Sequence, residues 1–160
     1  MNLIDYKLEL LKNCSAATAR TLSKNKNLNI SFSNSVEDSL VSNNNDINIK
    51  LKKLTDPLEI RGKIDYFSYI KRFFDKKIFN QFVPTQTNRH DLFRLIHNVR
   101  SLTLGIFFFP GSFKNIKTFF DKEGLNFYSL QSNTEINNYI HFLLNFLLER
   151  NIIDKVTKPK

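Results

Sequence analysis

The stretch "NVRSLTLGIFFFPGSFKNI", Asn98–Ile116, decides what kind of fold this chain can have. It sets an arginine before an almost completely apolar run, Leu102–Pro110, which ends at Pro110-Gly111. A membrane-spanning helix needs roughly 20 apolar residues, whereas this run is short and is interrupted by Thr103 and Gly105. We therefore predict that the stretch is the end of a central helix, buried on all sides in the core of a soluble domain.

The residues before this stretch predict three helices. Apolar side chains recur at helical spacing from Leu92 to Ile106, with Asn88 as the expected N-cap of that helix. Asp56-Pro57 combines a capping acid with a proline at the first helical position, and the amphipathic helix that it begins should reach Ile78 after roughly five to six turns. A first helix is expected from Ile4 to about Leu22.

Two further helices are predicted after the stretch. Apolar residues from Phe113 onward indicate a short helix that Gly124 should end. Ser132 and Glu135 form a capping-box pattern, and apolar residues follow at helical spacing as far as Leu147. The chain therefore contains enough amphipathic helix to build a helical core.

Two short segments, Leu28–Phe32 and Ile47–Leu51, alternate apolar and polar residues and predict two strands that pair as a long-looped hairpin. Between them, residues 33–45 are polar and rich in Asn and Ser, which predicts a flexible loop. The predicted fold class is mainly α. We expect one multi-helix domain over residues 1–154, a small two-stranded β element near its N-terminal third, and a basic tail at 155–160.

Charge and composition restrict the classes of function only loosely. Lys and Arg number 24 against 15 acids, a net charge of +9, which suits nucleic acid, an anionic surface or an acidic partner. The excess is spread along the chain, and the abundance of Lys, Asn, Ile and Phe is typical of an AT-rich genome. The first residues do not form a signal sequence, so we expect a cytoplasmic protein without a membrane anchor, and the single Cys14 excludes an internal disulfide.

The sequence predicts no catalytic site, metal site or bound cofactor in this chain. Four glycines are too few and too scattered for a phosphate-binding loop, and no thiol pair or carboxylate cluster accompanies His90 and His97. The acid pairs Asp65 with Asp75 and Glu59 with Asp65 lie on a predicted helix rich in Lys and Arg, where helical salt bridges are the expected arrangement. The many phenylalanines, at helical spacing, indicate core packing rather than platforms for stacking nucleotides.

Three blocks of sequence nevertheless occur in a recognisable order. The first is "AATARTLSKNKNLNISF", Ala16–Phe32, and the second is "RGKID", Arg61–Asp65, followed by Arg72. The third block consists of Phe93, Arg100, Leu104, Gly105, Gly111, Asn115 and Ile116. In these blocks the chain resembles the N-terminal region of the CobT-type subunit of the aerobic, ATP-dependent cobaltochelatase.

The chain also differs from that family. The family usually carries a Glu-Gln pair before the central arginine, a Glu two residues after it and an Arg pair after the glycine. Here those positions are His97, Asn98, Leu102, Phe107 and Phe108. The family continues through an acidic linker into a von Willebrand A-like domain with a "D.S.S" motif, which does not occur before Lys160. We therefore expect either a fragment or a shortened protein in which only the N-terminal domain is kept.

The resemblance implies a non-catalytic subunit or assembly domain that supports cobalt insertion into hydrogenobyrinic acid a,c-diamide in cobalamin biosynthesis. Its implied partners are a AAA+ ATPase subunit and a large chelatase subunit, so that ATP, magnesium and cobalt belong to the complex and not to this chain. The implied partner-binding residues are Arg61, Arg72 and Arg100. The implied structural residues are Asp65, Gly105, Gly111 and Asn115.

Two questions stay open from the sequence. The first is whether Arg100 pairs with Asp65, which the resemblance singles out on the preceding helix, or points into water; an arginine at the border of an apolar run must be paired or exposed, because burying it unpaired is costly. The second is the function itself, since a small basic helical protein that binds nucleic acid is the alternative. Salt-sensitive binding to nucleic acid would favour that alternative.

Overall fold

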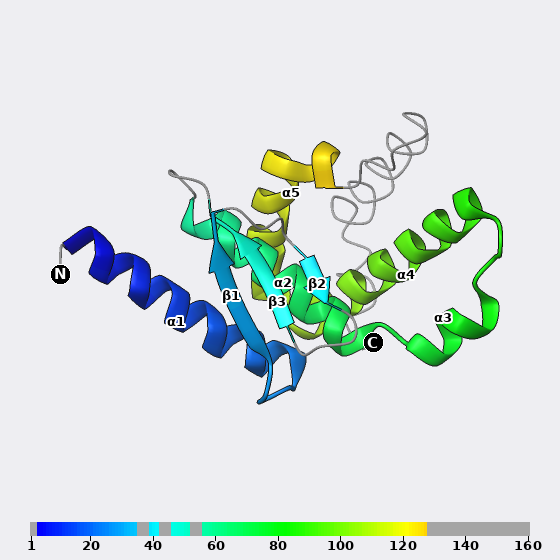
Figure 1. The fold of residues 1–160 in the computed structure, drawn as a ribbon, viewed down its shortest axis with the longest axis horizontal. Coiled ribbons are helices and arrows are strands. Elements are labelled where there is room, and N and C mark those ends of the chain that lie inside the picture. The colour runs from blue at the N-terminus through cyan, green and yellow to red at the C-terminus, as the bar shows by residue number, and fades with distance from the viewer. Residues whose placement is uncertain (1–2, 35–38, 42–45, 52–55, 128–160) are drawn as a thin grey trace, which may run out of the picture.

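The computed structural model describes residues 3–34, 39–41, 46–51 and 56–127 (Figure 1). The prediction of a mainly helical chain with a small β element near the N-terminal third is confirmed. The predicted helix from Ser132 and the basic tail at 155–160 lie outside the described residues. The elements are α1 (Leu3–Ser23), β1 (Asn29–Ser33), β2 (Ser39–Val41), β3 (Asp46–Lys50), α2 (Pro57–Phe73), α3 (Lys76–Phe82), α4 (Thr87–Phe108), the 3₁₀ turn η1 (Pro110–Ser112) and α5 (Phe113–Phe127).

The sheet has a third strand, which changes its topology. Its order is β1-β3-β2, with β3 parallel to β1 and antiparallel to β2. The predicted hairpin between the two alternating segments is therefore wrong, because β2 lies within the polar loop predicted at 33–45 and itself forms the antiparallel pair with β3. The alternation still identified the inward-facing side chains, since Ile47 and Ile49 are fully buried.

Helix α2 begins and ends where its capping residues require. Asp56 accepts a hydrogen bond from the Leu58 amide at 2.9 Å, as expected for an N-cap before Pro57. The expected continuation to Ile78 is wrong, because the backbone is extended at Phe74 and Asp75. The Asp75 carboxylate accepts from the Lys77 and Ile78 amides and so caps a separate helix, α3.

The helix buried on all sides is α2, not the end of α4. Every residue from Glu59 to Ile70 is buried except Arg61, because α1, α4, α5 and the sheet surround this helix. The predicted all-round burial of Leu102–Pro110 is wrong, since Phe108 is 56% exposed. Only one face of α4, which includes Leu102 and Ile106, packs into the core.

Two helix boundaries also differ from expectation. Helix α4 begins at Thr87 after an extended Gln86, so Asn88 is not its N-cap. Helix α5 passes through Gly124 to Phe127 instead of stopping at the glycine. A glycine within a helix costs only about 1 kcal/mol relative to alanine, so burial of the helix's apolar face outweighs it.

Among the described helices, none is by itself long and apolar enough to cross a membrane. Arg89–Phe108 and Pro110–Lys122 reach the necessary length and composition only together, and they meet at a bend of 117°.

Two glycines allow α2 to approach its neighbours closely. A Cβ on Gly62 would lie 2.3 Å from the Asn115 carbonyl oxygen and 2.6 Å from the Phe119 Cβ, so α5 rests directly on the α2 backbone there. A Cβ on Gly105 would lie 2.2 Å from the Tyr69 ring, so this glycine of α4 makes room for an α2 aromatic. Gly111, for which the resemblance implies a structural role, has no such constraint: a Cβ would meet nothing within 4 Å, and its φ is not positive.

These contacts predict which glycines accept a side chain. Gly62→Ala and Gly105→Ala should each lower the free energy of unfolding by on the order of 2 to 3 kcal/mol, because the added methyl must displace backbone or a packed ring. Gly111→Ala is the matched control and should change stability by less than about 0.5 kcal/mol. Urea unfolding of the three variants measures this difference, and equal losses at all three positions would contradict it.

Candidate functional site

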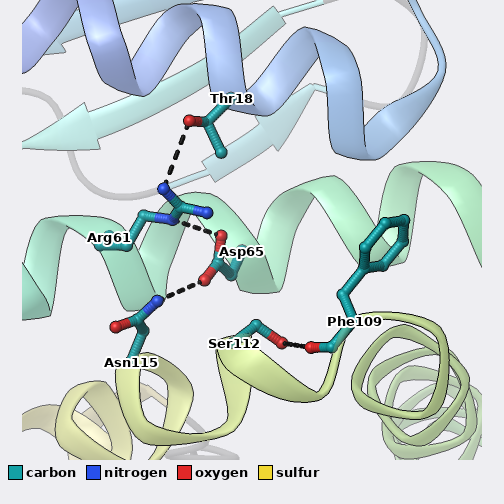
Figure 2. A network of polar contacts seen from close by, with 6 residues as sticks. All are labelled: Thr18, Arg61, Asp65, Phe109, Ser112 and Asn115. Carbon is teal, nitrogen blue, oxygen red and sulfur yellow. Dashed lines mark hydrogen bonds and ion pairs between the residues drawn. The ribbon is translucent and has the colours of Figure 1, made fainter.

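A network of polar contacts among the described residues centres on the carboxylate of Asp65 in α2 (Figure 2). Asp65 is fully buried. Its Oδ1 accepts from Arg61 Nε at 2.8 Å, and its Oδ2 accepts from Asn115 Nδ2 in α5 at 3.0 Å. Arg61 also donates from Nη1 to the Thr18 hydroxyl of α1 at 3.3 Å. One carboxylate therefore links α1, α2 and α5.

The local sequence explains this geometry. Arg61 and Asp65 are four residues apart in α2, so their side chains lie on the same helical face. Asn115 reaches the carboxylate because Gly62, on the adjacent turn, lets the α5 backbone come close. The "RGKID" block thus supplies the arginine, the close approach and the acid together.

Burial dominates the electrostatics of this network. Burial raises the pKa of Asp65, while the hydrogen bond from Asn115 and the Arg61 charge oppose that rise. Desolvation raises the pKa of Tyr69, one turn further along α2, to about 12. The Ser112 hydroxyl, which donates to the Phe109 carbonyl at 2.7 Å, interacts with Tyr69 and opposes this rise in pKa.

Arg72, an implied partner-binding residue, is engaged within the chain. Its Nη1 donates to the Leu22 carbonyl of α1 at 3.0 Å. The guanidinium carbon lies 5.1 Å from the ring centroids of both Phe73 and Phe109, and Phe109 stacks on Tyr69 at 5.9 Å. This arginine therefore fastens the end of α2 to α1 and to the segment after α4.

Arg100 does not pair with Asp65, so that hypothesis is wrong. Arg100 is exposed and donates to the Phe73 carbonyl at 3.2 Å. Phe73 is eight residues beyond Asp65, or about 12 Å along the helix, which is too far for the two charged groups to meet. Arg100 instead faces solvent, as the alternative predicted, and donates one hydrogen bond to the C-terminal end of α2.

The other candidate residues take ordinary structural roles. Glu59 and Lys63 form an ion pair at 3.3 Å and Asp65 pairs with Arg61, so the predicted helical salt bridges are confirmed for these two acids. The prediction is wrong for Asp75, which caps α3. Cys14 is an exposed free thiol. Within the described ranges, no group of three His, Cys, Asp or Glu side chains could hold a metal ion.

Sequence reasoning missed a second cluster, in which His97 packs among phenylalanines. Its ring lies 5.0 to 5.6 Å from the rings of Phe74, Phe79 and Phe93, and the residue is buried. Burial and the nearby Arg100 lower the pKa of His97. The signal was the i, i+4 spacing of Phe93 and His97, which places both rings on one face of α4.

Comparisons with protein families, curated proteins and solved structures found no match to this chain. The geometry must therefore indicate what the site can do. Its charged groups are hydrogen-bonded to one another or to backbone carbonyls, and its acid is buried. Such an arrangement fixes the positions of α1, α2 and α5 relative to one another.

The network predicts specific energetic coupling. A double-mutant cycle on Arg61→Ala and Asp65→Asn should show a coupling energy on the order of 1 kcal/mol, because each change leaves the other group without its partner. The value should stay below that of a fully buried ion pair, since the Arg61 side chain is 40% exposed.

The control is the same cycle with Arg100→Ala in place of Arg61→Ala. These two sites share no partner, so their effects on the free energy of unfolding should add to within about 0.5 kcal/mol. Coupling between Arg100 and Asp65 that equals the Arg61 value would contradict the arrangement described.

Tyr69 makes the free energy of unfolding depend on pH in the alkaline range. Its folded-state pKa, about 12, exceeds the ordinary value of 10.0, so above pH 10.0 the unfolded chain loses a proton that the folded chain retains, and stability falls as pH rises. Tyr69→Phe should reduce the loss of unfolding free energy between about pH 9 and about pH 11 by about 1 kcal/mol. Urea unfolding at the two pH values tests this, with Tyr6→Phe on an exposed tyrosine as the control that should retain the wild-type dependence.

Proposed function

We propose that this chain is a non-catalytic assembly domain of the kind found at the N-terminus of the CobT-type cobaltochelatase subunit, acting in cobalt insertion during cobalamin biosynthesis. The observation that carries the proposal is the convergence of the three resembling blocks. Thr18 comes from the first block, Arg61 and Asp65 from the second and Asn115 from the third, and all four meet in one network. Residues of a motif shared by a fold are expected to depend on one another in this way.

The internal engagement of Arg61 and Arg72 refines the proposed partner contacts. Arg72 is committed to Leu22 and two aromatic rings, and Arg61 to Asp65 and Thr18. Both therefore support the shape of the domain, although the 40% exposed side chain of Arg61 can still be reached by a partner. Arg100 is the implied contact residue with the greatest freedom, because it is exposed and makes one hydrogen bond to a backbone carbonyl.

Reconstitution tests the proposal. The purified chain should have no ATPase activity and insert no cobalt by itself, but it should co-elute with the AAA+ subunit of an aerobic cobaltochelatase in size-exclusion chromatography. Arg100→Glu should weaken that complex at least about tenfold, because a charge reversal at an interface places like charges together. Lys114→Glu reverses another exposed charge, on α5, and is the matched control.

Two results would oppose the proposal. Failure of the folded chain to bind either the AAA+ subunit or the large chelatase subunit would remove its basis. Salt-sensitive binding to duplex or single-stranded nucleic acid, with no binding to these subunits, would support the alternative of a nucleic-acid-binding protein.

A further inference from the structure

Helix α3 and the N-terminal half of α4 form a hairpin that extends away from α1 and the sheet (Figure 1). Phe79 of α3 holds the two helices together. Its ring lies 5.5 Å from Phe93, 5.7 Å from His90 and 5.6 Å from His97, all on one face of α4. The inner side of this hairpin is therefore a packed aromatic cluster.

Three large apolar side chains on the same hairpin face solvent. Ile78 is 42% exposed, Phe82 is 60% exposed and Ile96 is 52% exposed. Ile78 and Phe82 are one turn apart beside the inward-facing Phe79, and Ile96 lies beside the inward-facing stripe of Phe93 and His97. Because the two helices run in opposite directions, helical geometry places these three side chains on the same side of the hairpin. We call this surface the hairpin face.

Two arginines of α4 flank Ile96 on the hairpin face. Arg89 and Arg100 are seven residues before and four residues after Ile96, so they share its helical stripe, and both are exposed. From Lys76 to Phe108 the chain carries five Lys and Arg residues and one acid, Asp91, a net charge of +4 with the histidines neutral. Apolar side chains at the centre and arginines at the rim are the composition of a protein interface.

We propose that the hairpin face binds an acidic amphipathic helix of a protein partner. The apolar face of such a helix would cover Ile78, Phe82 and Ile96, and its carboxylates would pair with Arg89 and Arg100, whose guanidinium groups bind carboxylates in a bidentate manner. This inference rests on the hairpin alone and does not depend on the cobaltochelatase proposal.

The side chains favour a protein over nucleic acid. Surfaces that bind single-stranded nucleic acid present successive aromatic rings for stacking. Phe79 and Phe93 are turned toward each other inside the hairpin, so Phe82 is the one aromatic ring among the three exposed apolar side chains of the hairpin face. Two of the three exposed apolar residues, Ile78 and Ile96, are aliphatic and offer nothing to a phosphate backbone or to a base edge. They are suited to packing against the apolar stripe of a helix.

Selection from a random peptide library tests the proposal without assuming the partner. The full chain is immobilised, and peptides of about 16 residues, long enough for four helical turns, are selected for binding. The selected sequences should combine Asp and Glu with large apolar residues at helical spacing. Fluorescence anisotropy with one synthetic peptide should then show at least about tenfold weaker binding to Phe82→Ser and to Arg89→Glu.

Leu10→Ser is the matched control, since Leu10 is a comparably exposed apolar residue, 51%, on α1. This variant should bind the peptide as the wild type does, and circular dichroism should show that all three variants are folded. Because Phe82 and Arg89 are exposed, their replacement should leave the fold intact.

Several outcomes would overturn the proposal. The proposal fails if selection returns no peptide, only peptides without acidic residues, or peptides whose binding is unaffected by Phe82→Ser and Arg89→Glu. Loss of binding to single-stranded DNA or to phosphatidylserine vesicles in these variants, with no peptide binding, would assign the face to nucleic acid or to an anionic membrane. Sedimentation showing a dimer that Phe82→Ser dissociates would assign it to a second copy of the chain.

Discussion

The buried carboxylate of Asp65 in a helix surrounded on all sides is the constraint on which the rest of the structure depends. A carboxylate without access to water is stable only when hydrogen-bond donors reach both of its oxygens. Here one donor is Arg61 on the same helix, and the other is Asn115, 50 residues further along the chain. The packing of α5 on α2 is thus fixed in register as well as in distance, because only one position of α5 brings Asn115 to the acid.

The close packing around α2 also explains the glycines at positions 62 and 105. A Cβ at Gly62 would push Asn115 away from Asp65, since that atom would lie 2.3 Å from the Asn115 carbonyl oxygen. On the other side of the core, Gly105 accommodates Tyr69, whose ring in turn stacks on Phe109 beside Arg72. The close contacts at the two glycines, the stacking of Tyr69 on Phe109 and the hydrogen bonds of Asp65 therefore all involve α2. A change in any one of these contacts is expected to affect the others.

Local signals predicted the parts of this structure that depend on neighbouring residues. Capping chemistry located the start of α2 at Asp56, and period-two alternation identified Ile47 and Ile49 as inward-facing. The i, i+4 spacing of Arg61 and Asp65 made their ion pair foreseeable from the sequence. The end of α2 was not foreseen, because Asp75 resembles any other helical acid until the extended backbone before it is known.

Contacts between distant residues had no comparable signal. The parallel pairing of β1 with β3 depends on a short strand inside a polar loop, and nothing in the alternation of the two segments specifies strand direction. Apolar content misidentified the most buried helix, since a run such as Leu102–Pro110 is equally compatible with one buried face or several. Burial on all sides is set by the number of neighbours, which is why α2 is the central helix although it contains Lys63 and Asp65.

The positions of the residues that carry the resemblance indicate which part of the domain would determine its choice of partner. Thr18, Arg61, Asp65 and Asn115 bond to one another, so selection for a stable fold alone would preserve them, whatever the domain contacts. A resemblance carried by such residues is informative about architecture and much less so about partners. Positions of both kinds lie in α4: Gly105 and the exposed Arg100 belong to the resembling blocks, whereas His97 and Phe108 do not. The exposed residues of α4 and the hairpin face can therefore differ in partner specificity without any change to the buried network around Asp65.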